Sequence, residues 1–153
     1  MTGSPLLRLH RSGWTALELL LALVLLGILI EIAWPRWAAW SDRQAVVAAA
    51  RTIRTDLQRA RAAAILRGET IAVELDTMAA SYEARSLRGG QRLFGRRLEE
   101  GLFLRTTAYR ERILFTARGT GSLYSTTWIG AHDRPGARWH GTRVTPTGAI
   151  EAR

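Results

Sequence analysis

Residues 13–35 read GWTALELLLALVLLGILIEIAWP, and this stretch decides how the rest of the chain is interpreted. It is mostly apolar, yet Glu18 lies close to its start. A charge near the centre of a bilayer costs about 2.5–3.5 kcal/mol on insertion scales, so residues of this kind usually have a function. Glu18 therefore indicates something other than an ordinary membrane anchor.

The composition suits one domain of ordinary size with an appended apolar segment, since the chain has 153 residues. The formal net charge is +9, and all 22 basic residues are arginine. We attribute this choice of arginine to a GC-rich genome; the alternative is a surface that binds phosphate or carboxylate groups. There is no cysteine, which excludes disulfides and thiolate sites but indicates no compartment.

Three interpretations compete for residues 1–35. A cleaved secretory signal needs small residues at its cleavage site, whereas residues 31–37 read EIAWPRW. A plain transmembrane anchor needs about 20 apolar residues, and residues 14–34 suffice, but this leaves Glu18 unexplained. The third interpretation is a leader that is removed on the cytoplasmic side, before the apolar segment.

Residues 13–18, GWTALE, resemble the prepilin cleavage signal, usually Gly-Phe-Thr-Leu-x-Glu. The resemblance implies that a prepilin peptidase cuts between Gly13 and Trp14 and methylates the new amine of Trp14. Glu18 would be the fifth mature residue and Pro35 the twenty-second, and pilins and pseudopilins usually carry these residues there. The departure is Trp14 in place of phenylalanine.

Cleavage would place a positive amine on Trp14, and Glu18 of a neighbouring subunit can neutralise it. Two charges that are costly alone become tolerable when they are paired. Arg8 and Arg11 precede the apolar segment without any acid, so the positive-inside rule places this end in the cytoplasm. We read Glu31 as a residue of the opposite membrane interface.

These assignments divide the chain into a leader (1–13), a transmembrane and filament-core helix (14–35) and a periplasmic domain (36–153). In the domain, residues 37–67 have the period of a helix that ends at Gly68, and strands fill residues 69–152. The apolar stripe of the helix comprises Val46, Ala50, Ile53, Leu57, Ala60 and Ala64. The charged residues Arg51, Arg54, Asp56, Arg59 and Arg61 are expected largely off this stripe.

After Gly68 the pattern changes to short strands separated by turns rich in glycine, aspartate and proline. The expected strands are 71–75, 81–87, 102–105, 112–116, 122–128, 138–145 and 149–152. The predicted fold class is α+β, with one long N-terminal helix, membrane-spanning in its first half, packed on antiparallel sheet. This arrangement is type IV pilin-like.

The body resembles the H-type minor pseudopilin (GspH/FimT) family. Residues 60–71, ARAAAILRGETI, are similar to that family's Ala-Arg-x-x-Ala-x-x-Arg-Gly-x-x-Val pattern. Residues 113–115, ILF, followed by Gly119 and Gly121, resemble its mid-body strand and glycines. Residues 144–150, VTPTGAI, resemble its closing strand, turn and strand.

No catalytic or metal-binding pattern stands out, so we predict a non-enzyme without cofactors. The histidines are His10, His132 and His140; the first lies in the leader, and His132-Asp133 reads as a solvated turn. Glu99-Glu100-Gly101 also reads as a solvated turn. The chain would be a peptidase substrate.

Arginines of the body suggest a second function class, binding to DNA or to a partner protein. The candidate residues are Arg85, Arg88, Arg92, Arg96, Arg97, Arg138 and Arg143, with Trp128 and Trp139 nearby. Some FimT-type relatives are DNA-uptake pilins that use a Gly-Arg-x-Arg end. Residues 148–153 read GAIEAR, which lacks the first arginine and adds an acid, so we favour a solvated surface.

The resemblance implies a minor pseudopilin of the type II secretion system in the inner membrane, crossing it once. After processing it would join other major and minor pseudopilins at the tip of the periplasmic pseudopilus. The alternative is a FimT-like minor type IV pilin that binds DNA for uptake or supports pilus assembly.

Overall fold

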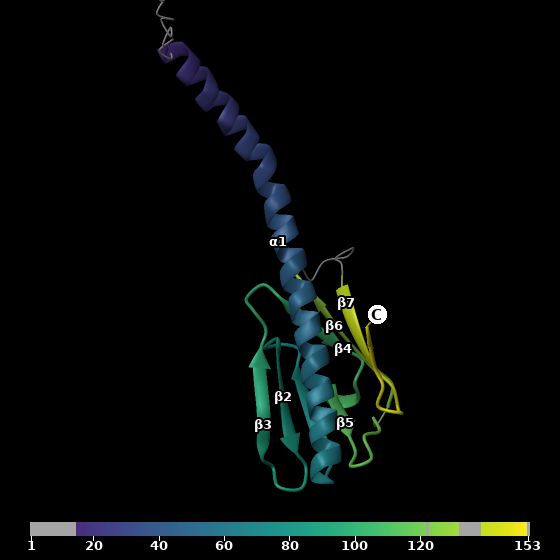
Figure 1. The fold of residues 1–153 in the computed structure, drawn as a ribbon. Helices are drawn as coiled ribbons and strands as arrows, with labels where there is room; N and C mark the ends of the chain where they lie inside the picture. The colour runs from purple at the N-terminus through teal and green to yellow at the C-terminus, as the bar shows by residue number, and fades with distance from the viewer. Residues whose placement is uncertain (1–14, 122, 132–138, 153) are drawn as a thin grey trace, which may run out of the picture. The chain divides into compact units, whose positions relative to one another are not determined.

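The computed structural model describes residues 15–121, 123–131 and 139–152, which form one long helix followed by eight short strands (Figure 1). The helix is α1 (Ala16–Arg67). The strands are β1 (Ile71–Asp76), β2 (Ser81–Ser86), β3 (Arg92–Arg97), β4 (Phe103–Thr106), β5 (Arg112–Phe115), β6 (Ser125–Gly130), β7 (Trp139–Val144) and β8 (Ile150–Ala152), with a 3-10 turn η1 (Tyr109–Glu111) before β5. The chain divides into two units, Met1–Ala39 and Trp40–Arg153.

The first unit contains an apolar stretch of α1, Ala16–Trp34, that is long enough to cross a membrane. Its mean hydropathy is 2.6 over 19 residues, and none of it is buried within the chain. Leucine side chains are exposed all round this part of α1, for example Leu20 and Leu29 at 61% and 63%. A helix with this surface requires an apolar environment outside the chain.

The carboxyl end of α1 is fixed by Gly68, as the sequence predicts. Gly68 has a φ of +64°, which a residue without Cβ adopts at little cost. Its amide donates to the carbonyl of Ile65 (3.3 Å), and the Glu69 amide donates to the carbonyl of Ala64 (3.2 Å). These two bonds form a Schellman motif, which satisfies carbonyls at the helix end.

The second unit consists of the later part of α1 and two antiparallel four-stranded sheets. One sheet has the order β3-β2-β1-β5 and the other β4-β6-β7-β8. In Figure 1 this part of α1 lies in front of the strands and runs roughly along β2 and β3, and its side chains share one core with both sheets. Phe115 and Ile71 fill that core from the first sheet, and Ile129 and Val144 fill it from the second.

The apolar stripe of α1 is confirmed, with Ala50 half-buried and its other members buried. Val46, Ile53 and Leu57 are buried, as are Ala60 and Ala64. The prediction that charged residues lie off this stripe is wrong for Asp56, which is only 6% exposed. Its burial depends on polar partners from the first sheet.

The predicted α+β fold is confirmed, and most strands lie within a few residues of their predicted bounds. β3 is the main omission, because Arg92–Arg97 reads RLFGRR and looks like a solvated basic run. β6 was predicted at 122–128 and spans Ser125–Gly130. The bounds of β6 are set by its pairing with β4 and β7.

Glycines from two distant turns meet where the sheets adjoin. The Arg61 Nε donates to the carbonyl oxygen of Gly119 at 2.8 Å. A Cβ on Gly148 would lie 1.9 Å from that same oxygen and 2.9 Å from the Arg61 Nε. The Gly121 amide donates to the carbonyl of Pro146 (3.0 Å). These glycines and Arg61 belong to the family-like motifs of the sequence, and the structure brings them together at one junction.

We predict that Gly148→Ala destabilises the domain by more than about 2 kcal/mol, because its φ of +78° and the contact with Gly119 both oppose a side chain. Gly89→Ala is the matched control, since nothing lies within 4 Å of a Cβ there, and a change within about 0.5 kcal/mol is expected. Urea unfolding of the full chain in micelles measures both. Equal stability of the two variants would contradict this account of the junction.

Candidate functional site

The amino-terminal end of α1 carries Glu18 in its first turn. Thr15 precedes the helix, and its Oγ1 accepts a hydrogen bond from the Glu18 amide at 3.2 Å. The Thr15 carbonyl accepts from the Leu19 amide at 3.1 Å. Thr15 is therefore the N-cap, and Thr-x-x-Glu is the sequence of a capping box. The carboxylate also lies at the positive end of the helix dipole, which lowers its cost there.

The other predicted processing and assembly residues are only partly described. Gly13 and Trp14 lie outside the described residues, so the cleavage position stays a prediction. Pro35 lies within α1, whose bounds run through it. Trp34, Trp37 and Trp40 are exposed at 73%, 70% and 53%, as residues of a membrane interface would be.

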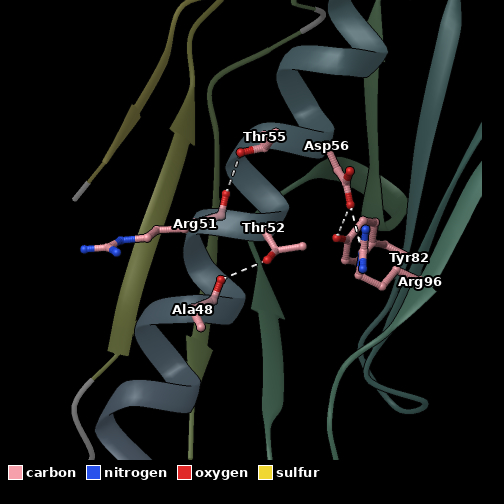
Figure 2. Close-up of polar contacts among 7 residues, drawn as sticks. All are labelled: Ala48, Arg51, Thr52, Thr55, Asp56, Tyr82 and Arg96. Carbon is pink, nitrogen blue, oxygen red and sulfur yellow. Dashed lines mark hydrogen bonds and ion pairs between the residues drawn. The ribbon is translucent and has the colours of Figure 1, made fainter.

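A buried carboxylate on α1 ties the helix to two strands (Figure 2). The Tyr82 hydroxyl on β2 donates to Asp56 Oδ2 at 2.7 Å, and the Arg96 Nε on β3 donates to the same oxygen at 3.1 Å. Tyr82 and Arg96 are directly opposite in the register of β2 and β3. A buried charge needs partners of this kind, because it has lost its water. Arg96 is thus a structural partner of Asp56.

The remaining polar contacts in Figure 2 lie on α1 itself. The Thr52 and Thr55 hydroxyls donate to the carbonyls of Ala48 and Arg51, each at 3.0 Å. Hydrogen bonds from a threonine to the carbonyl four residues earlier are a usual way to satisfy this side chain within a helix. Of the α1 side chains drawn in Figure 2, Asp56 is the one that bonds to the strands, whereas both threonines bond within the helix.

Burial raises the pKa of the Tyr82 phenol well above its ordinary value, and the hydrogen bond to Asp56 raises it further. The hydrogen bond to Asp56 also raises the pKa of Arg96. Below about pH 10, both folded and unfolded chains keep the Tyr82 proton. Above it, the unfolded chain loses this proton first, so the free energy of unfolding falls as pH rises.

We therefore predict that Tyr82→Phe removes a slope of up to about 1.4 kcal/mol per pH unit from the stability profile above about pH 10. Tyr109→Phe is the control, because Tyr109 is 70% exposed. Urea unfolding of the full chain between about pH 9 and 11 measures the slope. An unchanged slope in Tyr82→Phe would show that this phenol does not hold its proton in the folded chain.

Part of the predicted basic run is paired with acids of the same sheet and of α1. Glu83 on β2 pairs with Arg85 at 2.5 Å and with Arg92 on β3 at 3.3 Å. Glu74 on β1 pairs with Arg112 on β5 at 2.6 Å. The hydrogen bond to Glu83 raises the pKa of Arg85. Arg85 and Arg92 thus share one carboxylate, so this pairing compensates their positive charge only in part.

The other candidate arginines are dispersed. Within the described residues, Arg88 and Arg97 form no ion pair and remain candidates for binding an anion. Arg143 lies on β7 directly opposite Glu151 of β8. Arg138 lies outside the described residues, as do His132 and Asp133. Among the described candidates, Arg85, Arg92, Arg96 and Arg97 lie on the paired strands β2 and β3, whereas Arg143 lies on the other sheet.

We predict that Glu83→Gln strengthens binding to duplex DNA, because it releases two arginines at once. The slope of log affinity against log salt should steepen by about 1.8, which corresponds to two further phosphate contacts. Glu99→Gln changes the net charge equally at an exposed turn residue and should shift the slope less. Fluorescence anisotropy of the full chain in micelles measures the DNA affinity of both variants. Equal shifts in the salt slope would contradict the pairing of Glu83 with Arg85 and Arg92.

No group of three or more histidine, aspartate and glutamate residues in the described ranges is arranged to hold a metal ion. Several of the charged side chains described above form ion pairs between neighbouring strands or between a strand and α1. Their arrangement supports a structural role and offers no assembled catalytic group in this part of the chain.

Comparison with known proteins agrees with this picture. A family model described as "Type II transport protein GspH" matches residues 49–148, nearly two thirds of the chain. No curated protein matches significantly.

Two solved structures share the fold. The type IV minor pilin FimU of Pseudomonas aeruginosa has a TM-score of 0.60 and 20% identity, over 74% of this chain and 92% of its own. The minor pseudopilin EpsH from the Type 2 Secretion System of Vibrio cholerae has a TM-score of 0.60 and 16% identity, over 71% and 95%. The segment that matches the family begins at residue 49, within the part of α1 that carries the buried stripe, and ends at Gly148. The chain therefore belongs to the GspH family, which is described as type II transport protein GspH.

Proposed function

We propose that this chain is a minor pseudopilin of a type II secretion system, assembled near the tip of a periplasmic pseudopilus. The observation that carries the proposal is the apolar stretch Ala16–Trp34, which is unburied within the chain and has Glu18 in its first turn. Such a surface needs lipid at one stage and neighbouring helices at another. A helix meant only for anchoring has no use for Glu18.

The proposed sequence of events begins with insertion of residues 14–35 in the inner membrane, with the leader in the cytoplasm and residues 36–153 in the periplasm. A prepilin peptidase then removes residues 1–13 and methylates Trp14. The family match and the likeness in fold to the minor pseudopilin EpsH support assembly with other pseudopilins.

Glu18 has two possible partners for its carboxylate in this scheme: its own helix end and the amine of a neighbour. The N-cap bond uses the Glu18 amide and the Thr15 hydroxyl, so the carboxylate itself is left for another donor. A neighbouring subunit's amine on Trp14 supplies a full opposite charge, which the helix end does not. Pairing between subunits would also fix their axial register.

The second candidate is a minor type IV pilin, and the likeness to FimU favours it as strongly as the likeness to EpsH favours the first. The description of the matching family favours secretion. The pairing of Arg85 and Arg92 with Glu83 also counts against a DNA-binding pilin, because these guanidinium groups already have anionic partners. We therefore place the secretion role first.

We predict that Glu18→Ala leaves the chain inserted and processed but lowers its incorporation into filaments at least about tenfold, since one lost charge pair of ~1.4 kcal/mol suffices for that factor. Glu31→Ala is the matched control, because it removes the other acid of the same apolar segment and should leave assembly unchanged. Cross-linking between subunits in membranes of the producing strain measures incorporation. Normal assembly of Glu18→Ala would refute the proposed pairing.

A further inference from the structure

The face of α1 that points away from both sheets carries cations without acids. Between residues 43 and 67 the helix contains a single acid, Asp56, and this carboxylate is buried and bonded to β2 and β3. Arg51 and Arg54 lie on the exposed side, and Figure 2 shows the Arg51 side chain extending to the side of α1 opposite Asp56. The open face of this part of the helix is therefore charged with one sign only.

The side chains of Arg51 and Arg54 are free to bind a partner. Within the described residues, neither guanidinium group forms an ion pair, a hydrogen bond or a contact with an aromatic ring. By contrast, the Arg59 guanidinium carbon lies 5.5 Å from the ring centroid of Phe94. Residues three apart on a helix are neighbours, and like charges on neighbouring positions repel. A solvated helix face usually interleaves both signs, so this pair indicates that an anion comes from outside the chain.

The exposed face has the spacing of a seam between two helices. Its central positions are all exposed, and they follow one another in steps of four and three residues, as the a and d positions of a heptad do. These six positions, the outer seam, are Gln44, Ala48, Arg51, Thr55, Gln58 and Ala62. At about 1.5 Å per residue, the outer seam runs for about 27 Å along α1. Arg54 lies directly beside it, at a position where charge selects the partner of a coiled coil.

Small residues make the outer seam accessible to another helix. Ala48, Thr55 and Ala62 recur every seven residues, and the Thr55 hydroxyl bonds back to the Arg51 carbonyl at 3.0 Å. The distance between two packed helices depends on the side chains at the contact, and small ones allow a close approach. A helix packs along a seven-residue repeat, whereas a bilayer surface or a DNA duplex has no use for it. The spacing thus favours a helix as the source of the anion.

We propose, on the basis of the proposed function, that the outer seam binds a helix of a different filament subunit, one with acids three or four residues apart opposite Arg51 and Arg54. The α1 of a second copy offers no exposed acid between residues 43 and 67, and its arginines would be repelled. The charge of the seam therefore excludes pairing with a second copy and selects an acidic neighbour. Because the outer seam has no large apolar side chain, the contact depends on charge.

The test places a photo-cross-linking amino acid at Thr55, in the centre of the outer seam, in the full chain in its producing strain. We expect an adduct with another filament subunit, which mass spectrometry locates on a helix with two acids three or four residues apart. Arg51→Glu combined with Arg54→Glu should lower the adduct yield at least about tenfold, because attraction becomes repulsion. Arg51→Lys combined with Arg54→Lys keeps the charge and should keep most of the adduct.

Arg110→Glu combined with Arg118→Glu is the matched control, because both residues are exposed arginines outside the outer seam. This control reverses the same amount of charge and should leave the adduct yield unchanged. Arginine, lysine and glutamate have similar helix propensities, so the substitutions at Arg51 and Arg54 should leave the urea midpoint of the full chain unchanged.

A second cross-linker position, Leu20 in the apolar stretch of α1, distinguishes failure of the seam contact from failure of the proposed function. Adducts with filament subunits at Leu20 but none at Thr55 would overturn the seam contact and leave the proposed function standing, whereas no such adducts at either position would contradict both. An adduct of Thr55 with a second copy of this chain, with phospholipid or with DNA would overturn the seam contact. An adduct whose yield does not change in Arg51→Glu combined with Arg54→Glu would overturn it as well.

Discussion

The apolar stripe of α1 packs in one core with two sheets that share no strand. Ile53 and Leu57 fill the space between them, while Ala60 and Ala64, both fully buried, leave room for backbone to come close to the helix. Neither four-stranded sheet alone encloses a core, since each buries one face on the same helix. Removal of large side chains from such a shared position is costly, typically about 2–5 kcal/mol for leucine to alanine. The position of both sheets thus depends on a few helical residues.

Asp56 sets a second condition on this packing. A carboxylate within the stripe is tolerable only while Tyr82 and Arg96 both face it, and those residues are paired across β2 and β3. A slip of one residue in that pairing would turn either side chain to the opposite face of the sheet. The buried acid therefore favours one register for β2 and β3. That pairing in turn places Glu83 beside Arg92 on the outer face.

The sequence was most informative where the determining forces are local. The end of α1 at Gly68 and the strand expected at 71–75 follow from neighbouring residues, and both predictions are confirmed. β3 was missed because Leu93 and Phe94 are adjacent and so do not alternate; its partner strand decides its conformation. The burial of Asp56 was missed because its partners lie 26 and 40 residues away. The contact between Arg105 and the Trp139 ring likewise exists only after β4, β6 and β7 have paired.

The division of charge along the chain bears on what drives assembly. Residues 36–153 contain 20 arginines and 11 acids, so the formal excess of +9 (20 − 11) lies in this part of the chain, and only some of these arginines pair with acids of neighbouring elements. By contrast, the apolar surface of Ala16–Trp34 has no cover within the chain. Apolar surface exposed to water costs about 25 cal/mol per Å². In the proposed function, a subunit therefore leaves the bilayer only as neighbours cover this surface, and the carboxylate of Glu18 selects the axial position at which they do so.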